Sequence, residues 1–231
     1  MTFKFSIDDF KNYSTTEPIK NIFIIENFLS ENEKNLILNY INSLSEKDWE
    51  SHYINNLKDF CMRKFGRDDV DNLVAEGKFE ITPSWKDKNI SLYNNEKIEL
   101  LAKSIEKKIM SFIKEDSNLV PVGLPGVVQR MQTGSELVAH YDKYTDPSIQ
   151  YAGVIYINDD YLDGELFFSN KNFQIKPKSR TLVIFPGTEE FTHGVKIVGD
   201  GPTRYVLPGF ISIKNFYNEE KIKEFNNNYS S

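Results

Sequence analysis

Eight short runs of β-branched and aromatic residues, separated by turn residues, fill the chain from residue 126 to residue 213. Strands of this length and spacing, without helical patterns between them, are typical of a β-sandwich or barrel rather than of a βαβ repeat. We therefore expect an all-β core in this half of the chain. The runs are 126–132, 136–142, 150–158, 164–169, 173–176, 181–186, 192–198 and 203–213.

The preceding half of the chain, residues 1–120, predicts mainly helix. Residues 21–29 read as a short apolar strand that ends in a turn. Ser30 stands three positions before Glu33, which is the spacing of a capping box, and apolar residues follow at helical intervals. This pattern predicts a helix over residues 31–44. A second apolar stripe with lysines on the opposite face predicts a helix over residues 95–115.

Residues 46–94 are polar and irregular, with scattered aromatic residues. They are either an insertion that packs on its own aromatics or a lid over a binding site, because long connections in compact domains are often functional. At 231 residues the chain is expected to form one domain. It would comprise a helical N-terminal region over 1–120 with its insertion 46–94, a β core over 126–213 and a polar tail over 214–231.

The composition excludes several classes of protein. A formal net charge of −6 argues against non-specific nucleic-acid binding, which needs a basic surface. The single cysteine, Cys61, rules out an intrachain disulfide framework. No stretch approaches the roughly 20 apolar residues of a membrane-spanning helix, and Asp8 and Asp9 interrupt any signal-peptide pattern. We expect a soluble, cytoplasmic protein with no membrane or nucleic-acid partner.

Two of the three histidines belong to one pattern: His140 and Asp142 form a His-x-Asp pair, and His193 and Arg204 follow. Side chains two apart on a strand share a face, so His140 and Asp142 are expected to point together into the core. Two imidazoles and a carboxylate suit Fe(II) and leave three coordination positions open. A guanidinium on a nearby strand can bind a carboxylate through two parallel hydrogen bonds. Arg204 is therefore expected to hold a carboxylate of a co-substrate.

Three other interpretations of these residues stay open. A His-x-Asp pair can arise by chance, in which case the histidine is buried for packing and Arg204 forms an ordinary salt bridge. A β module that binds ligands without a metal would keep the shape and lack the chemistry. A Zn(II) hydrolase could use the same three ligands, although Arg204 then has no evident role.

At these residues the chain resembles the Fe(II)/2-oxoglutarate-dependent dioxygenases, and specifically their prolyl 4-hydroxylase-like branch. The resemblance covers about residues 22–45 and 126–213. The similar segments are NFLSENE (27–33), QRM (129–131) leading through Gly134 to HYD (140–142), YIND (156–159) followed by DGELFF (163–168), IKP (175–177) with LVIF (182–185), HGV (193–195) and GPTRY (201–205).

The resemblance implies a double-stranded β-helix (jelly roll) core, mainly β within an α+β class, with the N-terminal helices packed outside. It implies that His140, Asp142 and His193 bind iron and that Arg204 anchors 2-oxoglutarate. The implied cofactors are Fe(II), 2-oxoglutarate and molecular oxygen, with ascorbate as a further candidate. The implied reaction hydroxylates an unactivated C–H bond and releases succinate and carbon dioxide.

The chain departs from the family pattern at three positions. A tyrosine that often hydrogen-bonds 2-oxoglutarate is replaced by Met131, and Gln129, Tyr151 or Tyr156 could supply the missing donor. A usual tryptophan in the last strand is replaced by Phe210, and the first glycine of a Gly-Gly pair by Asp163. None of these changes removes an expected metal ligand.

The expected substrate is a proline in a peptide or protein, with a free amino acid or small metabolite as the alternative. Loops at the mouth of a β core usually carry specificity. The residues expected to contact substrate are Tyr141, Tyr144 and Trp85.

Overall fold

The computed structural model describes residues 5–51, 61, 66–78, 90–94, 99–114, 118–122, 127–144 and 146–216. Its main feature is a nine-stranded antiparallel sheet with strand order β1-β2-β11-β8-β13-β6-β4-β3, in which β5 pairs with β13. Its strands are β1 (Ser14–Ile19), β2 (Ile22–Glu26), β3 (Glu50–Ser51), β4 (Ile90–Asn94), β5 (Leu119–Val122), β6 (Val127–Met131), β8 (Ile149–Tyr156), β11 (Leu182–Pro186) and β13 (Arg204–Ile213).

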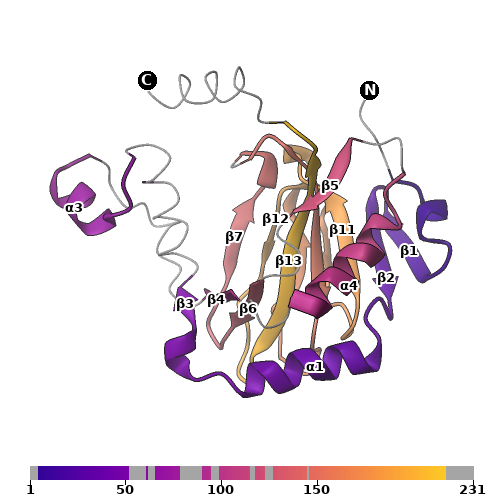
Figure 1. Ribbon diagram of the computed structural model, residues 1–231, viewed down its shortest axis with the longest axis horizontal. Helices are drawn as coiled ribbons and strands as arrows, with labels where there is room; N and C mark the ends of the chain where they lie inside the picture. The colour runs from indigo at the N-terminus through magenta and orange to yellow at the C-terminus, as the bar shows by residue number, and fades with distance from the viewer. Residues whose placement is uncertain are drawn as a thin grey trace.

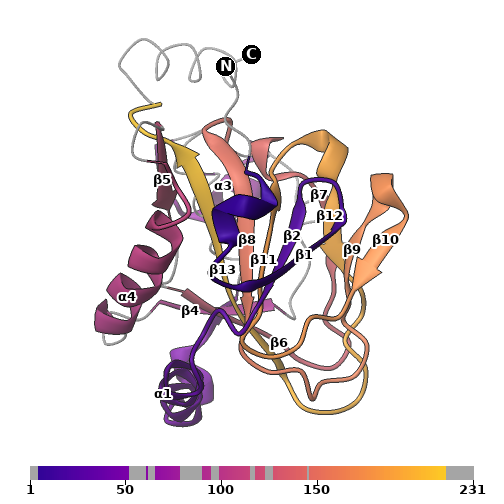
Figure 2. The ribbon, with the colours of Figure 1, turned by 90° about the vertical axis from the view of Figure 1, so that its right-hand side faces the viewer.

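A four-stranded sheet of order β10-β9-β12-β7 forms the second layer. Its strands are β7 (Leu137–His140), β9 (Leu166–Phe168), β10 (Phe173–Ile175) and β12 (His193–Val195). Figure 2 shows this smaller sheet on one side of the large sheet and helix α4 (Glu99–Met110) on the other side. Two facing antiparallel sheets with this strand order form the double-stranded β-helix core that the sequence predicts.

Helices α1 (Glu31–Asn42) and α4 lie on the outer side of the large sheet (Figure 1), and the short helix α3 (Val70–Ala75) lies apart from them. The expected capping box starts α1: the Ser30 hydroxyl accepts from the Glu33 amide at 3.2 Å, and the Glu33 carboxylate accepts from the Ser30 amide at 2.7 Å. Both orphan donors at the start of the helix are thereby satisfied. The prediction of helix over 31–44 is confirmed, and α4 lies within the predicted range 95–115.

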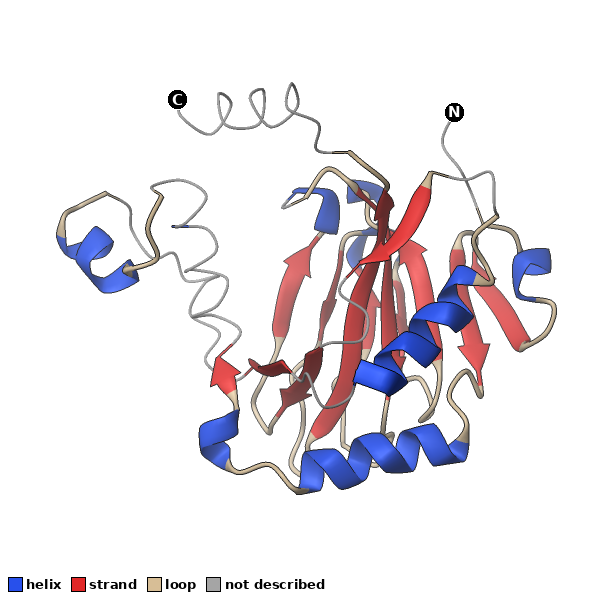
Figure 3. Ribbon diagram, in the orientation of Figure 1, coloured by secondary structure: helices blue, strands red, loops and turns tan. Residues whose placement is uncertain are grey.

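The central strands of the large sheet are buried on both faces, which explains their continuous apolar sequence. In β11, Leu182 and Ile184 pack in the cluster that contains the helix residues Ile37 and Ile105. Val183 and Phe185 pack in a second cluster with residues of the smaller sheet. The two clusters hold the helices, the large sheet and the small sheet together. Figure 3 shows the helices in blue beside the strands in red.

All eight strands predicted between residues 126 and 213 are present, as β6 to β13. The apolar strand predicted within residues 21–29 is present as β2. The prediction of a mainly helical N-terminal region was incomplete, because β1, β3, β4 and β5 also join the large sheet. β1 has the polar sequence STTEPI and is the edge strand of the sheet. One of its faces and its unpaired backbone edge are exposed to water, so its sequence lacks an apolar alternation. β4 lies inside the range 46–94 and pairs with β6 from Ile90↔Met131 to Asn94↔Val127, so this range is not wholly an irregular insertion.

Within the range 46–94 the structure describes residues 46–51, 61, 66–78 and 90–94. The lid interpretation stays a prediction, and Trp85 lies outside the described residues. Within the segments that the structure describes, no helix has the length and apolar character needed to cross a membrane.

Candidate metal centre and co-substrate pocket

The strand register brings His140 and His193 together. Strands β7 and β12 pair antiparallel, with His193 opposite His140, and the two ring centroids lie 4.6 Å apart. His140 closes β7 and His193 opens β12. The structure thus joins two histidines that are far apart in sequence at one end of the smaller sheet.

Asp142 completes the cluster from a turn and not from the strand. The sequence argument placed Asp142 on a strand beside His140, but β7 ends at His140 and Asp142 begins a 3-10 turn, Asp142–Tyr144. That expectation was wrong in its local geometry, because the chain turns as soon as it leaves the sheet. The carboxylate still lies 3.8 Å from His140 Nε2 and 3.9 Å from His193 Nε2.

Both imidazoles are oriented by backbone carbonyls. His140 Nδ1 lies 2.9 Å from the Val138 carbonyl oxygen, and His193 Nδ1 lies 3.1 Å from that of Phe191. A carbonyl can only accept, so each Nδ1–H donates and each Nε2 is left with its lone pair directed toward Asp142. Potential ligand atoms of the three residues all lie within 4.8 Å of one another.

The electrostatics favour a neutral imidazole at His193. Burial, together with the neighbouring His140, lowers the pKa of His193 to about 3. Burial raises the pKa of Asp142 to about 6, against the opposing effect of His140. Two imidazoles and one carboxylate, with no thiolate, are the donor set that suits a ferrous ion. The residues present therefore fit the metal that the sequence pattern predicts.

Glycines shape the approach to this cluster. A Cβ atom on Gly194 would lie 2.4 Å from the Leu137 carbonyl oxygen and 2.8 Å from the Phe167 ring. A Cβ atom on Gly187 would lie 2.9 Å from the Ile149 side chain and 3.4 Å from Asp142 Cβ. Both positions need glycine for space. The sequence alone does not reveal this role, because only the packed structure shows what lies beside each glycine.

Arg204 lies at the start of β13 and is 1% exposed. Its guanidinium donates to the Met131 sulfur at 3.2 Å and to the Tyr156 hydroxyl at 3.3 Å. Among the described residues no carboxylate pairs with it, and its Nε has no hydrogen-bond partner. A buried cation without an anion is costly unless a ligand supplies one. The buried surroundings of Arg204 are therefore suited to a carboxylate.

The other residues expected at the co-substrate pocket divide between two faces of the sheet. Tyr156 is fully buried in the core between the sheets, beside Arg204. Gln129 is 8% exposed and lies opposite Val206, itself a member of that core. Tyr151 packs on the helix side of the large sheet, where its hydroxyl accepts from the Phe5 amide at 3.1 Å. Tyr151 therefore does not supply the missing donor.

The expected substrate residues Tyr141 and Tyr144 lie next to the metal cluster in the chain. Their rings contact each other edge to face, with centroids 5.8 Å apart, and Tyr144 is 71% exposed. An exposed aromatic ring beside a metal cluster is available to a substrate.

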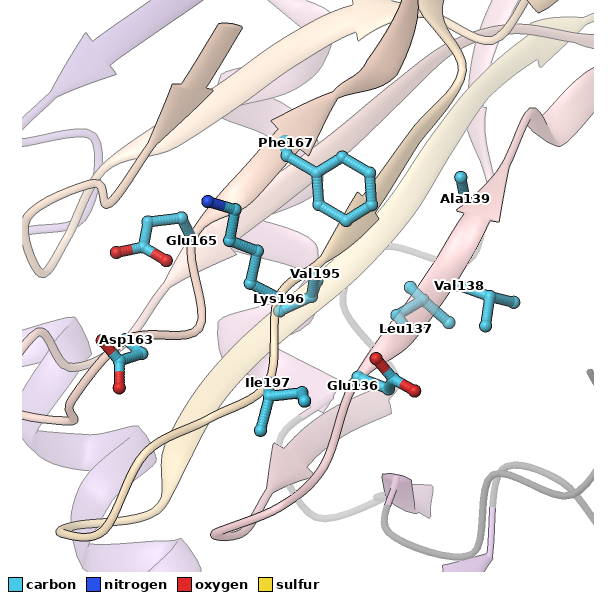
Figure 4. Close-up of a pocket in the computed structure, with 10 residues that line it drawn as sticks. All are labelled: Glu136, Leu137, Val138, Ala139, Asp163, Glu165, Phe167, Val195, Lys196 and Ile197. Atoms are coloured by element: carbon cyan, nitrogen blue, oxygen red, sulfur yellow. The ribbon is translucent and has the colours of Figure 1, made fainter.

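A separate cavity of about 720 Å³ lies at the smaller sheet and does not include the metal cluster. Figure 4 shows Phe167, Lys196 and Glu165 lining one side of it and the β7 residues Leu137 and Val138 lining the other. Leu166 and Phe168 belong to the core between the sheets, so Phe167, which lies between them, projects from the outer face. This cavity is thus lined in part from the outer face of the small sheet, and its lining does not include Arg204.

Comparisons with known proteins agree with this geometry. Residues 126–212 match the model of the 2OG-Fe(II) oxygenase superfamily. No curated protein sequence matches the chain. The comparison with solved structures finds similar folds at low sequence identity.

One similar structure is a prolyl hydroxylase from Trichoplax adhaerens in complex with a hypoxia inducible factor peptide fragment. It has 16% identity and a TM-score of 0.55, over 90% of this chain and 88% of that one. A second is the viral collagen prolyl hydroxylase of Paramecium Bursaria Chlorella virus-1 in complex with 2OG, with 18% identity, a TM-score of 0.54, and 84% and 96% coverage. A third is HygX from Streptomyces hygroscopicus with nickel and 2-oxoglutarate bound, with 12% identity, a TM-score of 0.53, and 86% and 85% coverage.

The structural neighbours show the fold, and residues 126–212 match the 2OG-Fe(II) oxygenase superfamily within it. The His-Asp-His cluster and the buried guanidinium lie within the matched range. The match and the site together support a dioxygenase that depends on Fe(II), 2-oxoglutarate and molecular oxygen.

Proposed function

We propose that this dioxygenase hydroxylates a proline in a peptide or protein, as a prolyl 4-hydroxylase-like enzyme in a single domain. The observation that carries the oxygenase chemistry is the pairing of one metal cluster with one buried, uncompensated guanidinium. The choice of proline is supported by the sequence resemblance and by neighbours with the same fold that are described as prolyl hydroxylases.

In the proposed site, His140, Asp142 and His193 hold the ferrous ion. The Val138 and Phe191 carbonyls fix the imidazoles so that Nε2 faces the ion. Asp142 supplies the single negative charge of the ligand set, and the low pKa of His193 keeps that ring unprotonated and ready to ligate. When bound, the ion and its co-substrate supply the oxidant for C–H hydroxylation, with succinate and carbon dioxide as co-products.

Arg204 is proposed to bind the distal carboxylate of 2-oxoglutarate. The Tyr156 hydroxyl accepts from the guanidinium and keeps its own proton available for a ligand oxygen. Gln129 is proposed to contribute a further polar contact from the adjacent strand. Because this pocket excludes water, a charge-assisted hydrogen bond formed there is stronger than at the surface.

Tyr141 and Tyr144 are proposed to contact the substrate, with Trp85 as a further contact. Tyr144 offers an exposed aromatic face close to the metal cluster. An aromatic surface suits a proline ring, which presents an apolar, rigid face.

The test combines product analysis with co-product analysis. Proline-containing peptides are incubated with the protein, Fe(II), 2-oxoglutarate, ascorbate and oxygen, and both succinate and the mass of the peptides are measured. The proposal expects a peptide that gains one oxygen atom and releases succinate in equal amount. Succinate release driven by a free amino acid, with no peptide modified, would replace the prolyl assignment with a small-molecule hydroxylase.

A further inference from the structure

Tyr161 is a fully buried aromatic residue in a polar turn, between β8 and β9. The turn sequence Asn158–Gly164 is rich in acidic and amide side chains, yet Tyr161 has no exposed surface and is among the largest buried side chains of the protein. Neither the sequence pattern nor the superfamily match assigns it a role. Its position therefore needs a structural reason.

The turn holds Tyr161 against Arg204. The guanidinium carbon of Arg204 lies 5.8 Å from the centre of the Tyr161 ring. Gly164 has a φ angle of +66°, and a Cβ atom there would lie 3.4 Å from Arg204 Cδ and 3.5 Å from the Tyr161 ring. A glycine at this point lets the backbone pass close to both side chains.

Two further contacts fix the turn from outside. The ammonium of Lys176 lies 4.7 Å from the Tyr161 ring centre and donates to the Tyr161 carbonyl oxygen. Asn158 donates to the Thr203 carbonyl oxygen at 2.8 Å and accepts from the Tyr205 amide at 2.8 Å, which ties the turn to β13 on both sides of Arg204. The Tyr161 ring is thus held rigidly beside the guanidinium.

The groups around Arg204 are almost all donors. The Tyr161 hydroxyl is buried and makes no hydrogen bond of normal geometry with a described residue. Arg204 can only donate, so the hydroxyl protons of Tyr156 and Tyr161 cannot be given to it. Burial raises the pKa of both tyrosines against the effect of Arg204, which keeps both hydroxyls protonated. Among the described residues, the guanidinium donates to the Tyr156 hydroxyl and to the weakly accepting sulfur of Met131.

We propose that the Tyr161 hydroxyl donates to the distal carboxylate of 2-oxoglutarate and supplies the donor that the family pattern expects at Met131. The Met131 thioether has no proton to give, whereas the buried hydroxyl of Tyr161 has one and finds no acceptor in the described part of the chain. Tyr161 thereby makes the pocket selective for a dicarboxylic 2-oxo acid over a monocarboxylic one. This assignment rests on the proposed role of Arg204.

The test is Tyr161→Phe, which removes only the hydroxyl. Binding is measured without oxygen on protein loaded with Mn(II), by calorimetry for 2-oxoglutarate and by ligand-observed nuclear magnetic resonance for 2-oxovalerate. The second acid has the same carbon chain and lacks the distal carboxylate. We expect the variant to bind 2-oxoglutarate about 10- to 100-fold more weakly, the usual effect of losing a hydrogen bond to a charged group. Binding of 2-oxovalerate should stay within about twofold of wild type.

Tyr151→Phe is the matched control, because it removes a buried hydroxyl from the helix side of the same sheet. It should leave binding of both acids unchanged and should lower the melting temperature, since the Phe5 amide loses its acceptor. Ligand-free Tyr161→Phe should melt no lower than wild type, because its hydroxyl gives its proton to no described group. A Tyr161→Phe protein that binds 2-oxoglutarate like wild type, or that loses both acids equally, overturns the proposal.

If Tyr161→Phe does not fold, the proposal is tested by nuclear magnetic resonance on wild-type protein that carries labelled tyrosine Cζ atoms. Two tyrosine resonances, those of Tyr156 and Tyr161, should then shift with 2-oxoglutarate and not with 2-oxovalerate. A single shifted resonance would contradict the role of Tyr161. Failure of the proposed function itself is distinguishable, because then metal-loaded wild type would not bind 2-oxoglutarate at all.

Discussion

His140 and His193 are register partners on the paired strands β7 and β12, and their ring centroids lie 4.6 Å apart. Strand pairing therefore places the two residues opposite each other, and the Val138 and Phe191 carbonyls orient their rings. Since a one-residue slip would move one ring to the opposite face of the sheet, the register of this small sheet determines whether the metal site exists.

Gly194→Ala tests this dependence on register. The added Cβ would lie 2.4 Å from the Leu137 carbonyl oxygen, so β7 and β12 must separate beside His193. We expect a loss of about 1–3 kcal/mol in the free energy of unfolding, as for other overpacked sites, and weaker metal binding. Urea denaturation and metal titration measure the two effects.

Val138→Ala, at an exposed position of β7, is the control and should change stability by less than about 0.5 kcal/mol. Unchanged metal affinity in Gly194→Ala would contradict the dependence.

Arg204→Met tests the carboxylate pocket. It removes a buried cation that has no carboxylate partner among the described residues, so the ligand-free protein should be no less stable than wild type. Binding of 2-oxoglutarate should weaken at least about 100-fold, because a bidentate charge-assisted contact is lost. Calorimetry and thermal melting give the two values.

Arg130→Met is the matched control for that substitution. Arg130 is also buried, but it forms two hydrogen bonds to Glu46 and lies 4.4 Å from the Trp49 ring. The Arg130→Met variant should have a lower melting temperature than wild type and should bind 2-oxoglutarate with wild-type affinity. Wild-type affinity for 2-oxoglutarate in Arg204→Met, or a large loss of that affinity in Arg130→Met, would argue against carboxylate binding by Arg204.

The ion pair between Lys108 and Glu33 links α4 to the start of α1. Burial acts to raise the pKa of Glu33, but hydrogen bonds from Lys108 and Ser30 outweigh it and lower the pKa below its usual value of 4.5. A lowered folded-state pKa stabilises the protein above pH 4.5, and this stabilisation is lost as the pH falls through the folded-state value. Glu33→Gln should therefore be about 1 kcal/mol less stable than wild type at pH 7.

The same difference should shrink as the pH falls from about 4.5 through the lowered folded-state pKa of Glu33, below which both proteins carry an uncharged side chain at position 33. Chemical denaturation at several pH values measures it. Lys108→Gln should show the same pH trend. A difference between Glu33→Gln and wild type that is constant with pH would contradict the ion-pair explanation.

Much of the fold could be predicted from the sequence because most of its elements have strong local signals. The apolar runs from residue 126 onward marked β6 to β13, and Ser30 with Glu33 marked the start of α1. The edge strand β1 was missed because its polar side chains carry no alternation, and β4 because it stands in a polar region where only the partner strand β6 defines it.

The residues of the candidate site also divide into those that the sequence predicts and those that it does not. His140, Asp142, His193 and Arg204 could be predicted from residue type and order. Tyr161 could not, because its burial depends on the turn that carries it toward Arg204. The sequence held one indirect signal, an aromatic residue within a polar turn that precedes Gly164. The place of Asp142 in a turn also depended on tertiary contacts, such as the hydrogen bond from the Lys143 amide to the Gly187 carbonyl oxygen.

The most direct test of the proposed iron site is succinate release from 2-oxoglutarate by anaerobically reconstituted Fe(II) protein after oxygen is admitted, in wild type, Asp142→Ala and Asp200→Ala. Asp200 is an exposed carboxylate outside the metal cluster and serves as the control. We predict that wild type and Asp200→Ala release succinate at equal rates and that Asp142→Ala is slower by at least about 100-fold, with a matching loss of bound iron. Equal succinate release by Asp142→Ala and wild type would contradict the assignment of iron to His140, Asp142 and His193.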